Sequence, residues 1–120
     1  MTPEELVAQL RRTILEDNIQ FYRELLVTTD IAKVSDPYWR TALELQGRLD
    51  DADRRVLLSI IRQTIVDSLS SVFAVIDGVT WLPGQKGNFV LRLGDDGEPL
   101  NGELQDLFLA AEEEECEGEN

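Results

Sequence analysis

The feature that most constrains the fold is a long apolar segment between Val56 and Ile76, closed by Gly78. At about 100° per residue, its Leu, Ile, Val and Phe side chains fall on one half of a helical wheel. Most of its Ser, Thr, Gln and Asp side chains fall on the other half. A helix is therefore expected from about Ala52 to Asp77, with Gly78 as its C-terminal stop. Such a helix buries its apolar half against neighbouring helices.

Two further helices are predicted before this segment, and each begins with a capping residue followed by a proline. In the first, Thr2 and Glu5 have the spacing of a capping box, and apolar residues recur at helical spacing until about residues 28–30. The second begins at Asp36 and ends near Gly47. The chain up to Gly78 therefore indicates three helices.

The pattern changes after Gly78. Two short apolar runs, 79–82 and 89–93, flank a loop rich in Pro and Gly, which predicts a β-hairpin over residues 79–93. Asn101 is then placed to cap a short final helix. The expected fold is mainly α, with a three-helix core, a small C-terminal β-hairpin and a short final helix. Residues 1–111 form a single domain, and residues 112–120 are expected to be an acidic, disordered tail.

The net charge of −13 is the strongest compositional signal. The six glutamates of the segment 112–120 supply less than half of this excess, so the rest of the chain is acidic too. A field of this sign favours basic partners and opposes direct binding of nucleic acid or of anionic membranes. It also supports solubility.

Catalytic signatures are absent from the sequence. The chain has no histidine, which excludes a His-based triad and a histidine metal ligand. Its Asp pairs do not have the calcium-loop pattern, and its glycines do not form a phosphate loop. No metal, cofactor or catalytic residue is expected. The single cysteine, Cys116, can form no intramolecular disulfide, and no apolar leader follows Met1, so a cytoplasmic protein is expected.

Arg62 is the one residue of the long apolar segment that helical periodicity does not explain, because it lies within the apolar half. A buried guanidinium requires a partner. Asn18 and Asp17 on the first helix are candidates, and Asn18 with Arg62 would then form a buried polar network. The alternatives are an arginine that extends to solvent at the edge of the core, or a small-molecule pocket formed by Arg62, Asp67 and Tyr22.

Three stretches resemble short acidic bacterial proteins of uncharacterised function, some of them neighbours of toxin or defence genes. They are DPYWR (36–40), IIRQTIVDSLSSVFAVIDG (60–78) and LNGELQDLFL (100–109). The resemblance implies a bacterial origin. It transfers no site residue.

The preferred hypothesis is a non-catalytic, intracellular protein-binding module that neutralises a basic partner, in concrete form an immunity protein for a nuclease-like bacterial toxin. A nucleic-acid-mimicking inhibitor of a DNA-binding enzyme is the first alternative, and a small enzyme with a pocket around Arg62 is the second. A homodimer built on the apolar face of the third helix is compatible with all three. The residues expected to bind the partner are exposed carboxylates and one exposed tryptophan: Asp50, Asp51, Asp53, Asp67, Trp81, Asp95 and Asp96.

Overall fold

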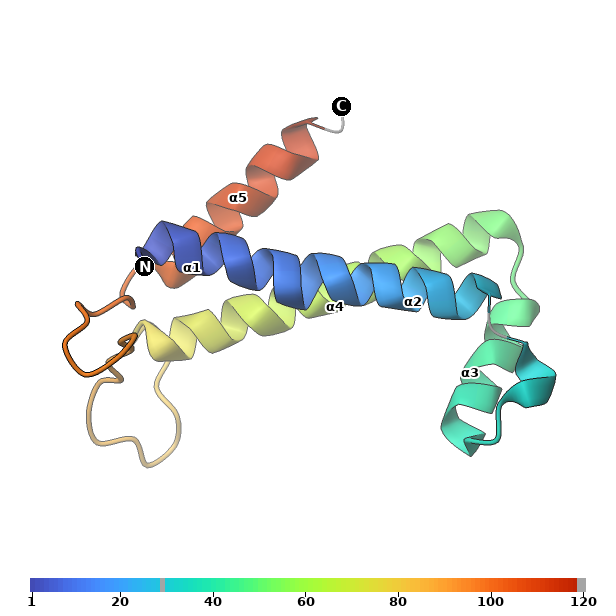
Figure 1. Cartoon of the computed structure of the whole chain (residues 1–120), viewed down its shortest axis with the longest axis horizontal. Coiled ribbons are helices and arrows are strands. Elements are labelled where there is room, and N and C mark those ends of the chain that lie inside the picture. Colours follow the sequence, from blue (N-terminus) through green and yellow to red (C-terminus); the bar gives the residue numbers. More distant parts are fainter. Residues whose placement is uncertain (29, 119–120) are drawn as a thin grey trace.

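The computed structural model describes residues 1–28 and 30–118. Over these residues the regular structure is entirely helical, so the predicted mainly α class is confirmed (Figure 1). The first predicted helix was expected to end near residues 28–30. Its last described residue is Thr28, and Thr29 lies outside the described residues, as do residues 119–120 of the predicted tail.

The first long helix is built from α1 (Pro3–Leu10), the π-helical segment η1 (Arg11–Glu16) and α2 (Asp17–Thr28), which run as one rod. Its start is the predicted capping box. The hydroxyl of Thr2 accepts a hydrogen bond from the backbone N–H of Glu5 at 3.1 Å, and the Glu5 carboxylate accepts one from the Thr2 N–H at 3.2 Å. Two backbone donors that the helix leaves unpaired are thereby satisfied.

The π-helical segment changes which side chains of this rod face the core. At its end the backbone N–H of Asp17 bonds to the carbonyl of Arg12, five residues back. Such a turn takes up about one residue more than an α-helical turn. Val7 and Leu15 would lie about 80° apart on an uninterrupted α-helix, and the extra residue brings them to within about 20°. Both are buried, with exposed fractions of 3% and 0%.

The other helices begin where Asp residues cap them. After a short 3₁₀ turn, η2 (Ile31–Lys33), helix α3 (Pro37–Gly47) begins with the Asp36 carboxylate bound to the N–H of Tyr38. Helix α4 (Asp51–Ile76) begins with the Asp50 carboxylate bound to the N–H of Asp53, and Gly78 follows its end at φ 83°. The last helix, α5 (Leu104–Gly118), starts beside α1 and runs obliquely away from the first rod (Figure 1).

The core lies between the first rod, α4 and α5. It contains Val7, Leu15, Ile19, Val66, Phe73, Leu104 and Phe108. The rings of Phe73 and Phe108 meet edge to face at 5.5 Å between centroids, and Leu104 and Phe108 are fully buried. A three-helix core is therefore present, but its third member is α5. Helix α3, which the sequence analysis placed in the core, lies at the far end of the molecule (Figure 1).

The predicted β-hairpin over residues 79–93 is wrong. The segment between α4 and α5 has no strand, and the apolar side chains expected to pack across the hairpin are exposed: Val79, Trp81, Leu82, Phe89, Val90 and Leu93. The backbone N–H groups of Val79 and Thr80 instead bond to the carbonyl of Ala74 at the end of α4. A two-stranded hairpin is marginal without a covering layer. Here Leu91 packs against the core, but most of the other apolar side chains of the segment have no covering layer.

Asn101 does not cap the last helix as predicted, but ties down the loop. Its side-chain amide donates to the carbonyls of Ile76 and Phe89 at 2.6 and 2.8 Å and accepts from the N–H of Leu91 at 2.9 Å. The start of α5 is capped from another element. The carboxylate of Asp77 accepts hydrogen bonds from the N–H groups of Gly102 and Gln105, at 2.7 and 2.8 Å.

The molecule is elongated, with extents of 51 × 37 × 26 Å (Figure 1). Its radius of gyration is 18.0 Å, whereas a compact domain of this length has about 14 Å. The segment assigned to a disordered tail also differs from expectation, because α5 continues through residues 112–118. An open arrangement of this kind leaves much of the two long helices without a covering layer.

Candidate functional site

Four charged side chains connect α5 to the first rod and α4. They are Arg11, Arg62, Glu112 and Glu115. Glu112 accepts hydrogen bonds from Arg11, at 2.7 Å from Nη2 and 3.2 Å from Nε, and forms an ion pair with Arg62, Nη1 to Oε2, at 2.9 Å. Glu115 binds Arg11 as well and lies 3.4 Å from Arg62 Nη2. This Arg–Glu cluster links η1, α4 and α5. Glu112 is 7% exposed, which makes it the most buried of the four.

Both guanidinium groups of the Arg–Glu cluster are held in their charged form. Burial by itself lowers the pKa of Arg11, but its hydrogen bonds to Glu112 and Glu115 outweigh this effect and raise the pKa. Burial also lowers the pKa of Arg62. Its hydrogen bond to Glu112 and the charges of Glu112, Glu115 and Glu16 together outweigh this effect and raise the pKa. Each carboxylate is already bound by two arginines. The arrangement is suited to holding α5 in place rather than to proton transfer.

The partner of Arg62 was missed because residues 112–120 were assigned to a tail. The sequence does carry a signal for it. Glu112 and Glu115 follow Phe108 by four and seven residues, which places all three on one face of a helix. Asn18, the expected partner, instead donates to the carbonyl of Ile14 on its own helix at 2.6 Å. The predicted Asn18–Arg62 pair is therefore not formed.

The opposite side of the two long helices is not covered by α5, and we call it the uncovered face. On α4, Arg62 and Thr64 lie about 160° apart, so they face opposite sides. Two adjoining hollows share Thr64 and Ile65. One, of about 350 Å³, is lined by Ile14, Asn18, Thr64, Ile65, Ser68, Leu69 and Val72. The other, of about 380 Å³, is lined by Tyr22, Leu26, Tyr38, Trp39, Ala42, Leu45, Leu57, Ile60, Ile61, Thr64 and Ile65.

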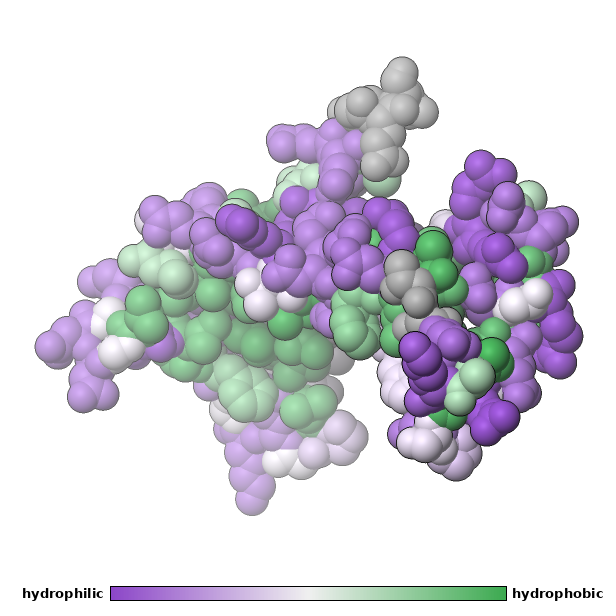
Figure 2. All heavy atoms as spheres, turned by 45° about the vertical axis from the view of Figure 1, so that its right-hand side comes forward, coloured by the Kyte–Doolittle hydropathy of each residue, from purple (hydrophilic) through white to green (hydrophobic). Residues whose placement is uncertain are grey.

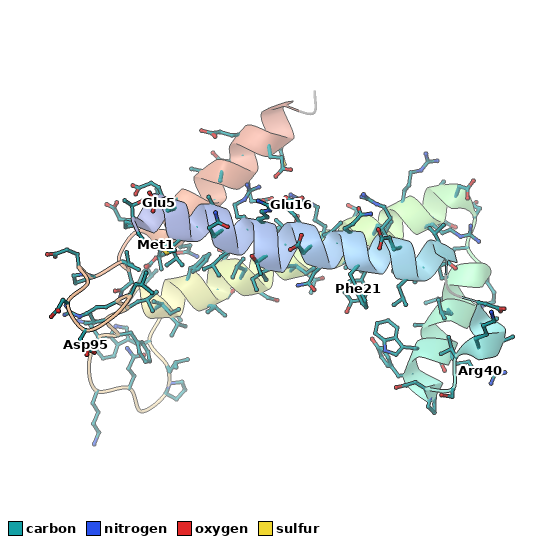
Figure 3. The ribbon with its side chains drawn as sticks, in the orientation of Figure 1. Met1, Glu5, Glu16, Phe21, Arg40 and Asp95 are labelled. Carbon is teal, nitrogen blue, oxygen red and sulfur yellow. The ribbon has the colours of Figure 1, made fainter. Side chains whose placement is uncertain are left out.

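Large apolar side chains remain exposed on and around this face. Ile60 is 58% exposed and Val56 57%, and Phe21 lies on the edge of the first rod that Figure 3 shows facing away from α5. Figure 2 shows apolar residues gathered along the middle of the molecule, with hydrophilic residues above them. Trp39 forms part of the wall, with its ring centroid 6.0 Å from that of Tyr22. Exposed apolar side chains that adjoin one another, with polar residues around them, are typical of an interaction surface.

The predicted partner-binding residues do not form one cluster. Asp50, Asp51 and Asp53 lie at the N-terminal end of α4, where Asp50 is the cap and Asp51 pairs with Arg54 at 3.4 Å. Trp81, Asp95 and Asp96 lie in the loop beyond the other end of the same helix (Figure 3 labels Asp95). Helix α4 has 26 residues, which at 1.5 Å per residue separates its ends by about 39 Å.

Two of the predicted carboxylates do flank exposed apolar residues on α4. Asp53, Val56, Ile60 and Asp67 are all exposed and fall within an arc of about 60°. The two carboxylates are about 21 Å apart along the helix axis. Asp67 also accepts a hydrogen bond from Gln63 at 2.8 Å. This stretch of α4 therefore presents apolar side chains between two negative charges.

The three residues suggested to line the pocket of a small enzyme are not brought together by the fold. Tyr22 lines the hollow next to α3, Arg62 faces α5, and Asp67 lies on the exposed side of α4. Another hollow, of about 730 Å³, lies between the end of α2 and α3, and its acidic residues Asp30 and Glu44 are balanced by Arg48 and Arg54. Over residues 1–28 and 30–118, no group of three or more Cys, Asp or Glu side chains is arranged to hold a metal ion.

Helix α4 is long and apolar enough to cross a membrane by length and composition alone. The most apolar 18-residue stretch of this helix has a mean hydropathy of 1.4, and 11% of that stretch is buried. Core helices of soluble proteins meet the same criterion, so this one helix is weak evidence of location. Comparisons of the chain with protein-family models, with curated proteins and with solved structures found no match.

Proposed function

We propose that this protein is a non-catalytic protein-binding module that binds a basic partner through its uncovered face. The two adjoining hollows of the uncovered face form one exposed apolar groove. The observation that carries the proposal is that this groove occurs in a chain of net charge −13. An amphipathic helix with basic flanks would bury its apolar side in the groove and place its cations near Asp53 and Asp67. The concrete form we propose is an immunity protein for a basic, nuclease-like toxin.

Charge distinguishes this partner from a second copy of the chain. Two copies each carry −13 and repel one another, whereas a basic partner is attracted and its encounter is accelerated. Light scattering tests this step, and we expect a monomer at low salt. The mimicry of nucleic acid gains no support from the fold, because the exposed Asp clusters lie at two ends of α4 and not in a row.

The binding experiment uses Trp39 as its reporter, in a Trp81→Phe background that removes the other tryptophan. A synthetic amphipathic helix of Leu and Lys is titrated in, with the matching Leu and Glu helix as the control. We expect a saturable change of Trp39 fluorescence with the Lys peptide, an affinity that falls with added salt, and no change with the Glu peptide. Equal responses to both peptides would contradict the proposal.

Variants then locate the site. Ile60 and Val90 are equally exposed, at 58% and 57%, but only Ile60 lines the groove. Ile60→Asp should weaken binding by about tenfold or more, since it removes the burial of one aliphatic side chain, and Val90→Asp should not. Asp67→Lys should slow association more than Asp106→Lys, which makes the same charge change on α5. Equal effects within either pair would place binding elsewhere.

The immunity form has its own test in the native host. A toxin gene directly upstream, whose basic product loses binding to the Ile60→Asp variant, would support it. A gene neighbourhood without a toxin would remove the immunity form and leave the more general binding function to the peptide experiment.

A further inference from the structure

Next to the Arg–Glu cluster, on the side of α4 opposite the uncovered face, α2 and α4 enclose a separate hollow that we call the arginine hollow. Its volume is about 270 Å³, and it is lined by Ile19, Arg23, Arg55, Leu58, Ser59 and Arg62. Ile19 is 8% exposed and, with the half-buried Leu58, supplies an apolar part of the lining. The remaining four side chains are hydrogen-bond donors, and three of them are cations.

This concentration of positive charge is unusual for the chain as a whole. Three of only 11 Lys and Arg residues line one small hollow in a protein of net charge −13. In a chain with 24 Asp and Glu, an arginine placed by chance is expected to lie near a carboxylate. Arg62 has such partners in Glu112 and Glu115, yet its side chain remains 30% exposed.

The other donors of the hollow are largely uncommitted. Within the described part of the chain, the side chains of Arg55 and Ser59 make no hydrogen bond or ion pair, and Arg23 makes one hydrogen bond, to Gln20 at 3.4 Å. A guanidinium carries five N–H donors in a planar fork that matches the oxygens of phosphate and carboxylate. Several donors around a small apolar patch are therefore available for a bound group.

We propose that the arginine hollow binds one phosphate group, carried by a small phosphomonoester with an apolar part. A phosphate is favoured over a carboxylate because its two negative charges and several oxygens can engage more than one guanidinium. The apolar part of the ligand would contact Ile19 and Leu58. A polyanion such as nucleic acid is disfavoured, since its further charges would meet the acidic remainder of the protein.

This site is independent of the protein-binding function proposed above. Arg62 and the uncovered face lie on opposite sides of α4, so a ligand in one does not occupy the other. Glu16 lies close enough to Arg62 to interact with its charge, and Figure 3 shows it on the side of the first rod toward α5. A bound phosphate would be repelled by this carboxylate, which supplies a variant that should strengthen binding.

The test is a calorimetric titration of the full chain with inorganic phosphate, phenyl phosphate and acetate at one fixed, low ionic strength. We expect saturable binding of both phosphates, tighter for phenyl phosphate, and no saturable binding of acetate. Arg55→Gln should weaken phenyl phosphate binding by about fivefold or more, and Glu16→Gln should strengthen it. Arg40→Gln removes the same charge from helix α3, outside the lining of the hollow (Figure 3), and should change the affinity less than twofold.

The Arg55 side chain is exposed and makes no hydrogen bond or ion pair within residues 1–28 and 30–118, so its variant should unfold close to the wild-type temperature and any loss of binding is local. Equal losses in the Arg55 and Arg40 variants would show general electrostatic attraction and overturn the site. Acetate binding as tight as phosphate would overturn the choice of ligand. The absence of saturable binding by either phosphate would overturn the proposal as a whole.

Discussion

Replacing Glu112 by Gln should destabilise the protein by about 2 kcal/mol. Glu112 is 7% exposed and accepts hydrogen bonds from both Arg11 and Arg62. Gln has the same shape but no charge, so the variant leaves two guanidinium groups at the α5 interface with one carboxylate between them. Removing one partner of a buried ion pair costs about 3–5 kcal/mol.

Two features of the structure reduce that cost. Glu115 remains bound to both arginines, and the side chains of Arg11 and Arg62 are 17% and 30% exposed, so water can solvate part of each charge. We therefore expect about 2 kcal/mol, which lowers the melting temperature of a chain of this length by about 8 °C. The loss should begin in α5, because the cluster fixes the C-terminal half of this helix.

Urea unfolding followed by circular dichroism measures the change, with Glu113→Gln as the matched control. Glu113 is the next residue and is exposed, so the control removes the same charge without touching the cluster. Its effect should stay within about 0.5 kcal/mol. Arg11→Gln in combination with Glu112→Gln should cost less than the sum of the two single changes, since both break the same contact. Equal effects of the Glu112 and Glu113 variants would refute the structural role of the cluster.

Three further predictions concern how the last helix and its loop are fixed. Phe108→Ala should cost about 3–5 kcal/mol in urea unfolding, because this fully buried ring leaves a cavity against Phe73. Asp77→Ala should cost about 1–2 kcal/mol, since it removes the acceptor for two backbone N–H groups at the start of α5, and the exposed Asp106→Ala should not. Asn101→Ala should speed hydrogen exchange of the Leu91 amide by about tenfold or more while leaving the helices folded, and unchanged exchange would show that the loop is held in another way.

Helix starts and stops were predictable because their chemistry is local. Thr2 with Glu5, Asp36 and Asp50 each satisfy backbone donors within three residues, and Gly78 adopts the positive φ that ends α4. Nothing beyond the neighbouring residues is needed to form these contacts. The same local reasoning gave a wrong prediction at Asn101, which was expected to cap the last helix. Its side chain instead bonds to backbone groups of two distant segments, and Asp77 caps α5.

The core was less predictable, because amphipathic periodicity shows that a helix face is buried but not what buries it. Helix α3 has an apolar side as the sequence suggested, yet it packs at the end of the molecule while α5 closes the core. The hairpin failed for a related reason. Two apolar runs around a turn predict paired strands only if a further layer covers them, and most of the apolar side chains of residues 79–93 remain exposed.

The binding surfaces were predictable only where they depend on a single helix. Asp53 and Asp67 were identified as exposed carboxylates, but their relation to Val56 and Ile60 depends only on helical geometry and could have been derived. The groove next to Trp39 could not, since it requires the position of α3 relative to α2 and α4. Nor could the arginine hollow, in which Arg23 and Arg55 come together only when the first rod and α4 lie antiparallel.

The two most conspicuous irregularities of the sequence are halves of one interaction. Arg62 lies where an apolar residue is expected on α4, and the acidic run after residue 111 is what composition assigns to a solvated tail. Within residues 112–118, only Glu112 and Glu115 are in phase with Leu104 and Phe108, so a helix that continues from the core carries these two carboxylates to the arginines. Their neighbours Glu113 and Glu114 point to solvent. An arginine out of place in one helix is therefore a reason to look for carboxylates at helical spacing beyond a buried aromatic in another, even where charge density alone favours disorder.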